Sequence, residues 1–160
     1  MAGWTEFFAA EVGASTALAG FVIVAISINL TRIIAYPWLP GRAAETLIAP
    51  TGVLVVSSYM LVPGQSAAAL DTELFVTGAL MWLMPTIIQF RTYRADAAVP
   101  RRSLLVRCLL SLLSGVPIMV AAVLMLERAP DAISWMVPGI IVSIVATVIN
   151  AWVLLVEIVR

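Results

Sequence analysis

The chain has 160 residues, of which 62% are hydrophobic and only 11% are charged, whereas soluble domains are about half apolar and about a quarter charged. Nine Arg balance nine acidic residues, so no overall field attracts nucleic acid. The lack of His and the single cysteine, Cys108, exclude from these residues a His-built metal or haem site, a Ser-His or Cys-His nucleophile and an internal disulfide. We therefore expect a membrane protein with no cofactor, no catalytic role and no nucleic-acid partner.

Five apolar stretches are each near or above the roughly 20 residues that cross about 30 Å of hydrocarbon. A soluble core is the alternative, but nine basic and nine acidic residues cannot cover the surface of so apolar a domain. Long apolar runs without alternation favour helices over barrel strands. We predict an all-α fold, a single transmembrane domain over 1–160, with five membrane-spanning helices at about 7–34, 43–62, 72–93, 103–126 and 133–157.

The distribution of charge predicts how the chain is threaded. A cleaved signal peptide is the alternative for the first stretch, but no Lys or Arg precedes it, so we expect a retained helix. Five crossings place eight of the nine Arg and three acidic residues on one side, which gives a net charge of +5 there and −5 on the other side. The positive-inside rule then predicts the N-terminus outside and the C-terminus in the cytoplasm. Four of these arginines are expected to attract anionic lipid head groups: Arg91, Arg94, Arg101 and Arg102.

The first helix is predicted to carry two different faces. Glu11 and Asn29 are eighteen residues apart, about five turns, so they share a face, with Ser15 close to it. Polar groups in membrane helices usually face the protein interior. The opposite face carries the small residues that let two helix backbones approach closely, which are Gly13, Ala17 and Gly20.

Similar polar lines occur on the last two helices. Ser143, Thr147 and Asn150 fall near one line on the fifth helix, and Arg107 begins another on the fourth. Most of these groups lie toward the cytoplasmic side, as expected for a polar cavity open to the cytoplasm. Two alternatives remain: the hydroxyls and amides only join helices, and Arg107 only snorkels to the head groups. The predicted pore or polar-stripe residues are Glu11, Ser15, Asn29, Arg107, Ser143, Thr147 and Asn150.

Charged residues and prolines mark the helix ends and bends. Glu45 and Glu157 lie near Arg42 and Arg160 in sequence and are predicted to form interfacial ion pairs. Asp71 stands where an N-cap would begin the third helix. Four prolines are predicted to kink helices, because each removes a backbone hydrogen bond: Pro50, Pro85, Pro117 and Pro138.

One phrase in the first two helices resembles a known group of proteins. The run Val24-Ala-Ile-Ser-Ile-Asn-Leu30 is followed by Arg32, and Leu39-Pro-Gly-Arg-Ala-Ala-Glu45 opens the second helix. This phrase is similar to one in small uncharacterised bacterial multi-pass membrane proteins. The resemblance implies a setting in the bacterial cytoplasmic membrane and brings with it no activity, substrate or functional residue.

These patterns predict a small integral membrane protein that self-associates and mediates or gates the passage of an ion or small solute. Association through the small residues of the first helix is expected to give the polar stripes of the first and fifth helices a common interior. The alternative is a non-transporting accessory or regulatory subunit, in which the same stripes dock onto a larger membrane partner.

Overall fold

The computed structural model describes residues 2–36, 39–95 and 101–156, which are helical apart from short turns. The described residues form no strand, which confirms the predicted all-α fold, and five helices are long and apolar enough to cross a membrane. They are α1 (Ala2–Ile28), α3 (Leu39–Leu61), α4 (Ala67–Ala95), α5 (Arg101–Leu126) and α6 (Met136–Val156). Two short elements accompany them, α2 (Leu30–Ala35) after α1 and the 3₁₀ helix η1 (Ala132–Trp135) before α6.

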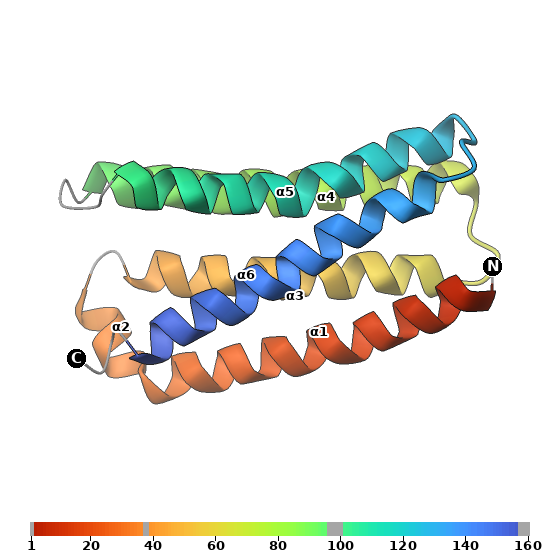
Figure 1. The fold of residues 1–160 in the computed structure, drawn as a ribbon. Helices are drawn as coiled ribbons and strands as arrows, with labels where there is room; N and C mark the ends of the chain where they lie inside the picture. Colours follow the sequence, from red (N-terminus) through yellow and green to blue (C-terminus); the bar gives the residue numbers. More distant parts are fainter. Residues whose placement is uncertain (1, 37–38, 96–100, 157–160) are drawn as a thin grey trace.

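Successive long helices run in opposite directions, so all helix termini lie at one of two ends of the bundle (Figure 1). α4 and α5 lie side by side, α1 packs against α3, and α6 crosses the bundle diagonally, in contact with α5, α3 and α1. We call the end where α1 begins the N-terminal end. The opposite end is the arginine-rich end, because the helix termini there carry Arg32, Arg42, Arg91, Arg94, Arg101 and Arg102.

Several helix boundaries differ from those predicted. The first helix begins at Ala2 and is interrupted at Asn29, whose φ of −100° and ψ of 9° separate α1 from α2. α4 begins at Ala67, so the prediction that Asp71 is its N-cap is wrong. The hydroxyl of Ser66 receives a hydrogen bond from the Ala69 amide at 3.3 Å, which is the usual role of a cap.

Three of the four prolines lie inside helices as predicted: Pro50 in α3, Pro85 in α4 and Pro117 in α5. Pro138 does not interrupt a helix. It lies in the first turn of α6, where an amide has no partner within its own helix, so its missing N–H breaks no bond there.

An apolar core fills the bundle from its middle to the N-terminal end. It joins all five long helices, with Trp4 and Phe7 packed at its edge. Met81 of α4 marks its limit toward the arginine-rich end and is 3% exposed. The other large members are Phe8, Val53, Val56, Leu74, Ile118, Met136 and Ile140.

Glycines allow α4, α5 and α6 to approach until their backbones touch. A Cβ added at Gly115 of α5 would overlap the carbonyl oxygen of Gly78 in α4, and one added at Gly139 of α6 would lie 2.9 Å from the carbonyl oxygen of Ser114. Small residues serve this purpose in membrane helices generally. These three glycines therefore fix the distances between α4, α5 and α6.

The predicted packing face of α1 has no such contacts. A Cβ added at Gly13 or Gly20 would meet nothing within 4 Å, and Ala17 is exposed. We call these three residues the open face of α1. It points away from the chain that carries it, toward lipid or another protein.

Candidate functional site

A charged pair lies inside the bundle. Arg107 of α5 and Glu45 of α3 form an ion pair between Nη2 and Oε2, with a second contact of 3.4 Å between Nε and Oε1. The two side chains are only 11% and 8% exposed. Each charge therefore depends on the other, because removing one partner of a buried pair leaves the remaining charge without compensation.

Gln89 of α4 joins this pair to a third helix. Its Nε2 donates hydrogen bonds to Glu45 Oε1 and, over 2.9 Å, to Ser111 Oγ. The Ser111 hydroxyl in turn donates to the Arg107 carbonyl oxygen at 3.0 Å. Gln89 is 1% exposed, and its Oε1 is buried with no hydrogen-bond partner in the described chain. We call Glu45, Gln89, Arg107 and Ser111 the polar cluster.

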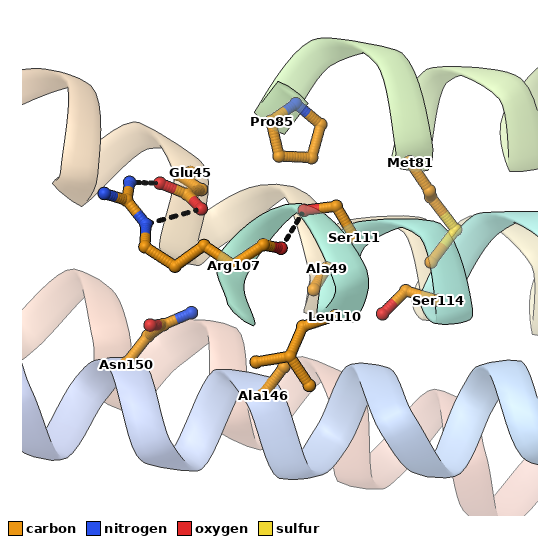
Figure 2. A pocket seen from close by; sticks show the side chains of 10 residues that line it. All are labelled: Glu45, Ala49, Met81, Pro85, Arg107, Leu110, Ser111, Ser114, Ala146 and Asn150. Carbon is orange, nitrogen blue, oxygen red and sulfur yellow. Dashed lines mark hydrogen bonds and ion pairs between the residues drawn. The ribbon is translucent and has the colours of Figure 1, made fainter. Parts of the chain in front are cut away.

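A small cavity borders the polar cluster (Figure 2). Its volume of about 30 Å³ has room for roughly one or two water molecules. Asn150 points into this region from α6, and its amide makes no hydrogen bond within the described part of the chain. Pro85 and Met81 also line the cavity. Because Pro85 has no N–H, the Met81 carbonyl lacks its usual helical donor.

The four helices bring these groups together at one depth. Glu45 and Arg107 lie six residues after the first residues of α3 and α5, and Gln89 and Asn150 lie six residues before the last residues of α4 and α6. All four helix ends are at the arginine-rich end, and six residues of helix span about 9 Å. The polar cluster and Asn150 therefore form one layer across the bundle, between the apolar core and the arginine-rich end.

The other predicted polar-stripe residues are buried, but their hydroxyls are used locally. Ser15 donates to the Glu11 carbonyl at 2.6 Å, Ser143 to the Gly139 carbonyl at 2.8 Å, and Thr147 to the Ser143 carbonyl at 2.7 Å. Asn29 also bonds to the preceding turn of helix, because its Nδ2 donates to the Ala25 carbonyl at 3.0 Å. Of the seven predicted residues, only Arg107 and Asn150 line the cavity.

Glu11 lies apart from this layer, near the N-terminal end. It is half-buried, and its Oε2 is buried without a hydrogen-bond partner in the described chain. Ser57 Oγ and Asp71 Oδ1, in the same half of the bundle, share that property. These three atoms are separated from the polar cluster by the apolar core.

Two sequence-based expectations need correction. Glu45 was predicted to pair with Arg42 at the interface. In the structure it pairs with Arg107, which is distant in sequence but adjacent in the folded chain. For the same reason Arg107 does not snorkel outward; its guanidinium is held inside the bundle by Glu45. The predicted pair of Glu157 and Arg160 lies outside the described residues.

The polar stripes also differ from the expected arrangement in an oligomer. Ser15 and Asn29 of α1, and Ser143 and Thr147 of α6, are all buried within a single chain. They are therefore not available to form an interior shared between subunits, since exposing them would require the bundle to open. A polar route, if it uses them, has to run through each chain.

The fold and the polar cluster define a helical bundle with five helices apolar enough to span a membrane and a charged pair in its interior. No protein-family model, no curated protein and no solved structure matches the chain. What the chain does therefore has to follow from its own side chains.

Proposed function

We propose that this chain mediates or gates the passage of an ion or small solute across the bacterial cytoplasmic membrane, and that it is not an enzyme. The observation that carries the proposal is the buried Glu45–Arg107 pair beside a cavity that also holds the free amide of Asn150. Ionisable side chains in membrane interiors are costly and commonly mark ion or proton pathways. The cavity volume of about 30 Å³ favours a permeant of about the size of water, such as a proton carried on water or a small ion.

The route we propose has a polar half and an apolar gate. The polar cluster and Asn150 form the half at the arginine-rich end, which the positive-inside rule places in the cytoplasm, with the N-terminus outside. The apolar core that begins at Met81 closes the other half, and apolar constrictions of this kind gate channels by excluding water. Glu11 would act at the outer mouth.

Proton flux into liposomes tests this function. The purified protein is reconstituted with an encapsulated pH-sensitive dye, and acidification is followed after an external acid pulse, with valinomycin and K⁺ present to balance charge. We expect Asn150→Leu to slow acidification by about tenfold or more, because an apolar side chain replaces the free amide in the cavity. Met81→Ala, which removes bulk from the gate, is expected to speed it.

Ile149→Val is the matched control. Ile149 is adjacent to Asn150 in α6 but exposed on the outside of the bundle, so this change should leave the rate unchanged. Glu11→Gln tests the outer mouth in the same assay. The proposal is wrong if liposomes with the parent protein acidify no faster than empty ones, both for protons and for K⁺ measured with a K⁺-sensitive dye. It is also wrong if neither Asn150→Leu nor Met81→Ala changes the rate.

We further propose that the chain is a homo-oligomer that associates through the open face of α1. Only 17% of the most apolar stretch of α1 is buried inside the bundle, the smallest share among the five spanning helices of the described chain. The same observation supports a second candidate, a non-transporting accessory or regulatory subunit whose open face binds a larger membrane partner. Mass measurement after gentle-detergent purification separates the two, because a homogeneous homo-oligomer favours passage and a stoichiometric partner favours the accessory role.

The arginine-rich end supports a third, compatible property. Arg91, Arg94, Arg101 and Arg102 are all exposed there. We propose that they attract anionic lipid head groups, an interaction worth about 1 kcal/mol for each basic residue near the membrane surface.

A further inference from the structure

A groove on the outside of the bundle, between α3 and α4, is separate from the polar cluster. Its volume is about 440 Å³. Most of its lining is apolar and faces the surrounding lipid, with Val76, Leu80 and Met84 exposed along α4. Tyr59, Thr72 and Glu73 are the polar lining residues nearest the N-terminal end, and Thr51 and Thr77 lie farther along the groove. The groove is therefore most polar at the end nearest the N-terminal end of the bundle and mostly apolar over the rest of its length.

The polar part of the groove offers acceptors and one donor. Gln65 Nε2 donates a hydrogen bond to Glu73 Oε2, which orients the carboxylate. The other atom of that amide, Gln65 Oε1, is buried and has no partner in the described chain. The Tyr59 hydroxyl likewise makes no hydrogen bond within the described residues, so it is available as a donor. A carboxylate, and a hydroxyl with no partner among the described residues, thus lie at one end of an apolar channel.

The depth of Glu73 matches the level of lipid head groups. α4 has 29 residues and so is about 43 Å long, which exceeds a hydrocarbon layer of about 30 Å by roughly 6 Å at each end. Glu73 lies six residues after the start of α4, about 9 Å along the helix. Its carboxylate is therefore near the boundary between head groups and acyl chains, and Tyr59, near the end of α3, lies where interfacial tyrosines are common.

We infer that this groove binds one membrane lipid whose head group carries a primary ammonium, such as phosphatidylethanolamine. The N–H donors of the ammonium match the Glu73 carboxylate, and the Tyr59 hydroxyl donates to the lipid phosphate. An acyl chain lies along Val76, Leu80 and Met84 toward the middle of the membrane. The site stands whether or not the chain conducts ions.

A second groove, between α4 and α5, provides an internal comparison. Its volume is about 300 Å³, and its lining has no polar part, consisting of Phe75, Val116, Met119, Val120, Val123 and Leu124. It can accept an acyl chain but has no group that selects a head group. Head-group preference is therefore expected in the α3–α4 groove alone.

Native mass spectrometry with two lipids of identical acyl chains tests the inference. The full chain in mild detergent is titrated with phosphatidylethanolamine or with phosphatidylcholine, whose quaternary ammonium has no N–H donor. We expect the first lipid to bind with an affinity about fivefold or more higher for phosphatidylethanolamine than for phosphatidylcholine. Only phosphatidylethanolamine can donate a charge-assisted hydrogen bond from its ammonium. Glu73→Gln should abolish that preference, and Tyr59→Phe should weaken binding of both lipids.

Glu6→Gln is the matched control, since it removes an exposed carboxylate of α1 outside the groove and should change neither affinity. Phosphatidylethanolamine with a photoreactive group in its acyl chain should label Val55 or Leu80 in the α3–α4 groove more than Val116 or Val120 in the α4–α5 groove. Equal binding of the two lipids by the parent protein, or equal labelling of the two grooves, overturns the inference. The parent-protein comparison gives this answer even if Glu73→Gln fails to fold.

Discussion

Replacing Arg107 with Leu is expected to lower the free energy of unfolding by about 3–5 kcal/mol, the range for breaking one side of a buried ion pair. The loss arises because Glu45 is 8% exposed and would keep its charge in the membrane interior without a counter-charge. Gln89 offers hydrogen bonds to the carboxylate but no charge. Unfolding by SDS in mixed micelles, followed by far-ultraviolet circular dichroism, measures the change.

The double variant Glu45→Leu/Arg107→Leu distinguishes the loss of the pair from general damage. It removes both charges, so we expect it to recover most of the stability that Arg107→Leu loses. It should nevertheless be inactive in the flux assay, because both charges of the polar cluster are gone. Arg102→Leu, at an exposed position one turn and a half away on α5, should change stability little. If Arg107→Leu is as stable as the parent chain, the pair is not the buried contact described above.

Replacing Gly115 with Ala is expected to destabilise the bundle by about 3 kcal/mol, the upper part of the range for overpacking a well-packed interior. The added Cβ would overlap the Gly78 carbonyl oxygen and lie 2.8 Å from the Trp82 Cβ and 2.9 Å from the Trp82 amide nitrogen. These are backbone or backbone-proximal atoms, so α4 and α5 have to separate along their interface. The same SDS unfolding experiment measures the effect.

Gly13→Ala and Gly20→Ala are the matched controls, because an added Cβ at either position meets nothing within 4 Å. Unfolding of the single chain should be unchanged or slightly stabilised, by up to about 1 kcal/mol, since Ala favours helix more than Gly. A large loss in either control, or none in Gly115→Ala, would contradict the packing described for α4 and α5.

Hydropathy was sufficient to predict the fold. Each membrane helix is a long apolar run with few charges, so its existence and type follow from local sequence alone. The boundaries were less accurate because hydropathy does not show which residue caps a helix; Ser66, not Asp71, accepts the capping hydrogen bond. The start of α4 at Ala67, ahead of Asp71, is the clearest case. The break at Asn29 has no comparable hydropathy signal.

The polar cluster was only partly predictable, because its contacts join helices that are far apart in sequence. Glu45 was assigned to Arg42 on sequence proximity, whereas its partner Arg107 lies 62 residues away. Depth along the helices did place Arg107 and Asn150 toward the same side of the membrane. It could not show which side chains meet, because that depends on how α3, α4, α5 and α6 are arranged around one another.

The small residues show how far helix faces alone can lead. Gly13, Ala17 and Gly20 were predicted to join helices of different copies of the chain, and this stays a prediction: a Cβ added at either glycine meets nothing within 4 Å, and Ala17 is exposed. Gly78 and Gly115 were not singled out in the sequence, and they bring the backbones of α4 and α5 into close contact. The residues on a helix face can be read from the sequence, but the helix that packs against that face depends on the tertiary arrangement.

Cysteine accessibility tests the central claim most directly, namely that the chain crosses the membrane five times with its arginine-rich end in the cytoplasm. In a Cys108→Ser background, one cysteine is placed at exposed Ser66, between α3 and α4, and in a second variant at exposed Ser103, in the first turn of α5. Labelling of intact cells with a membrane-impermeant maleimide should modify Ser66→Cys, and should reach Ser103→Cys only after the membrane is permeabilised. Labelling of Ser103→Cys in intact cells would contradict the account.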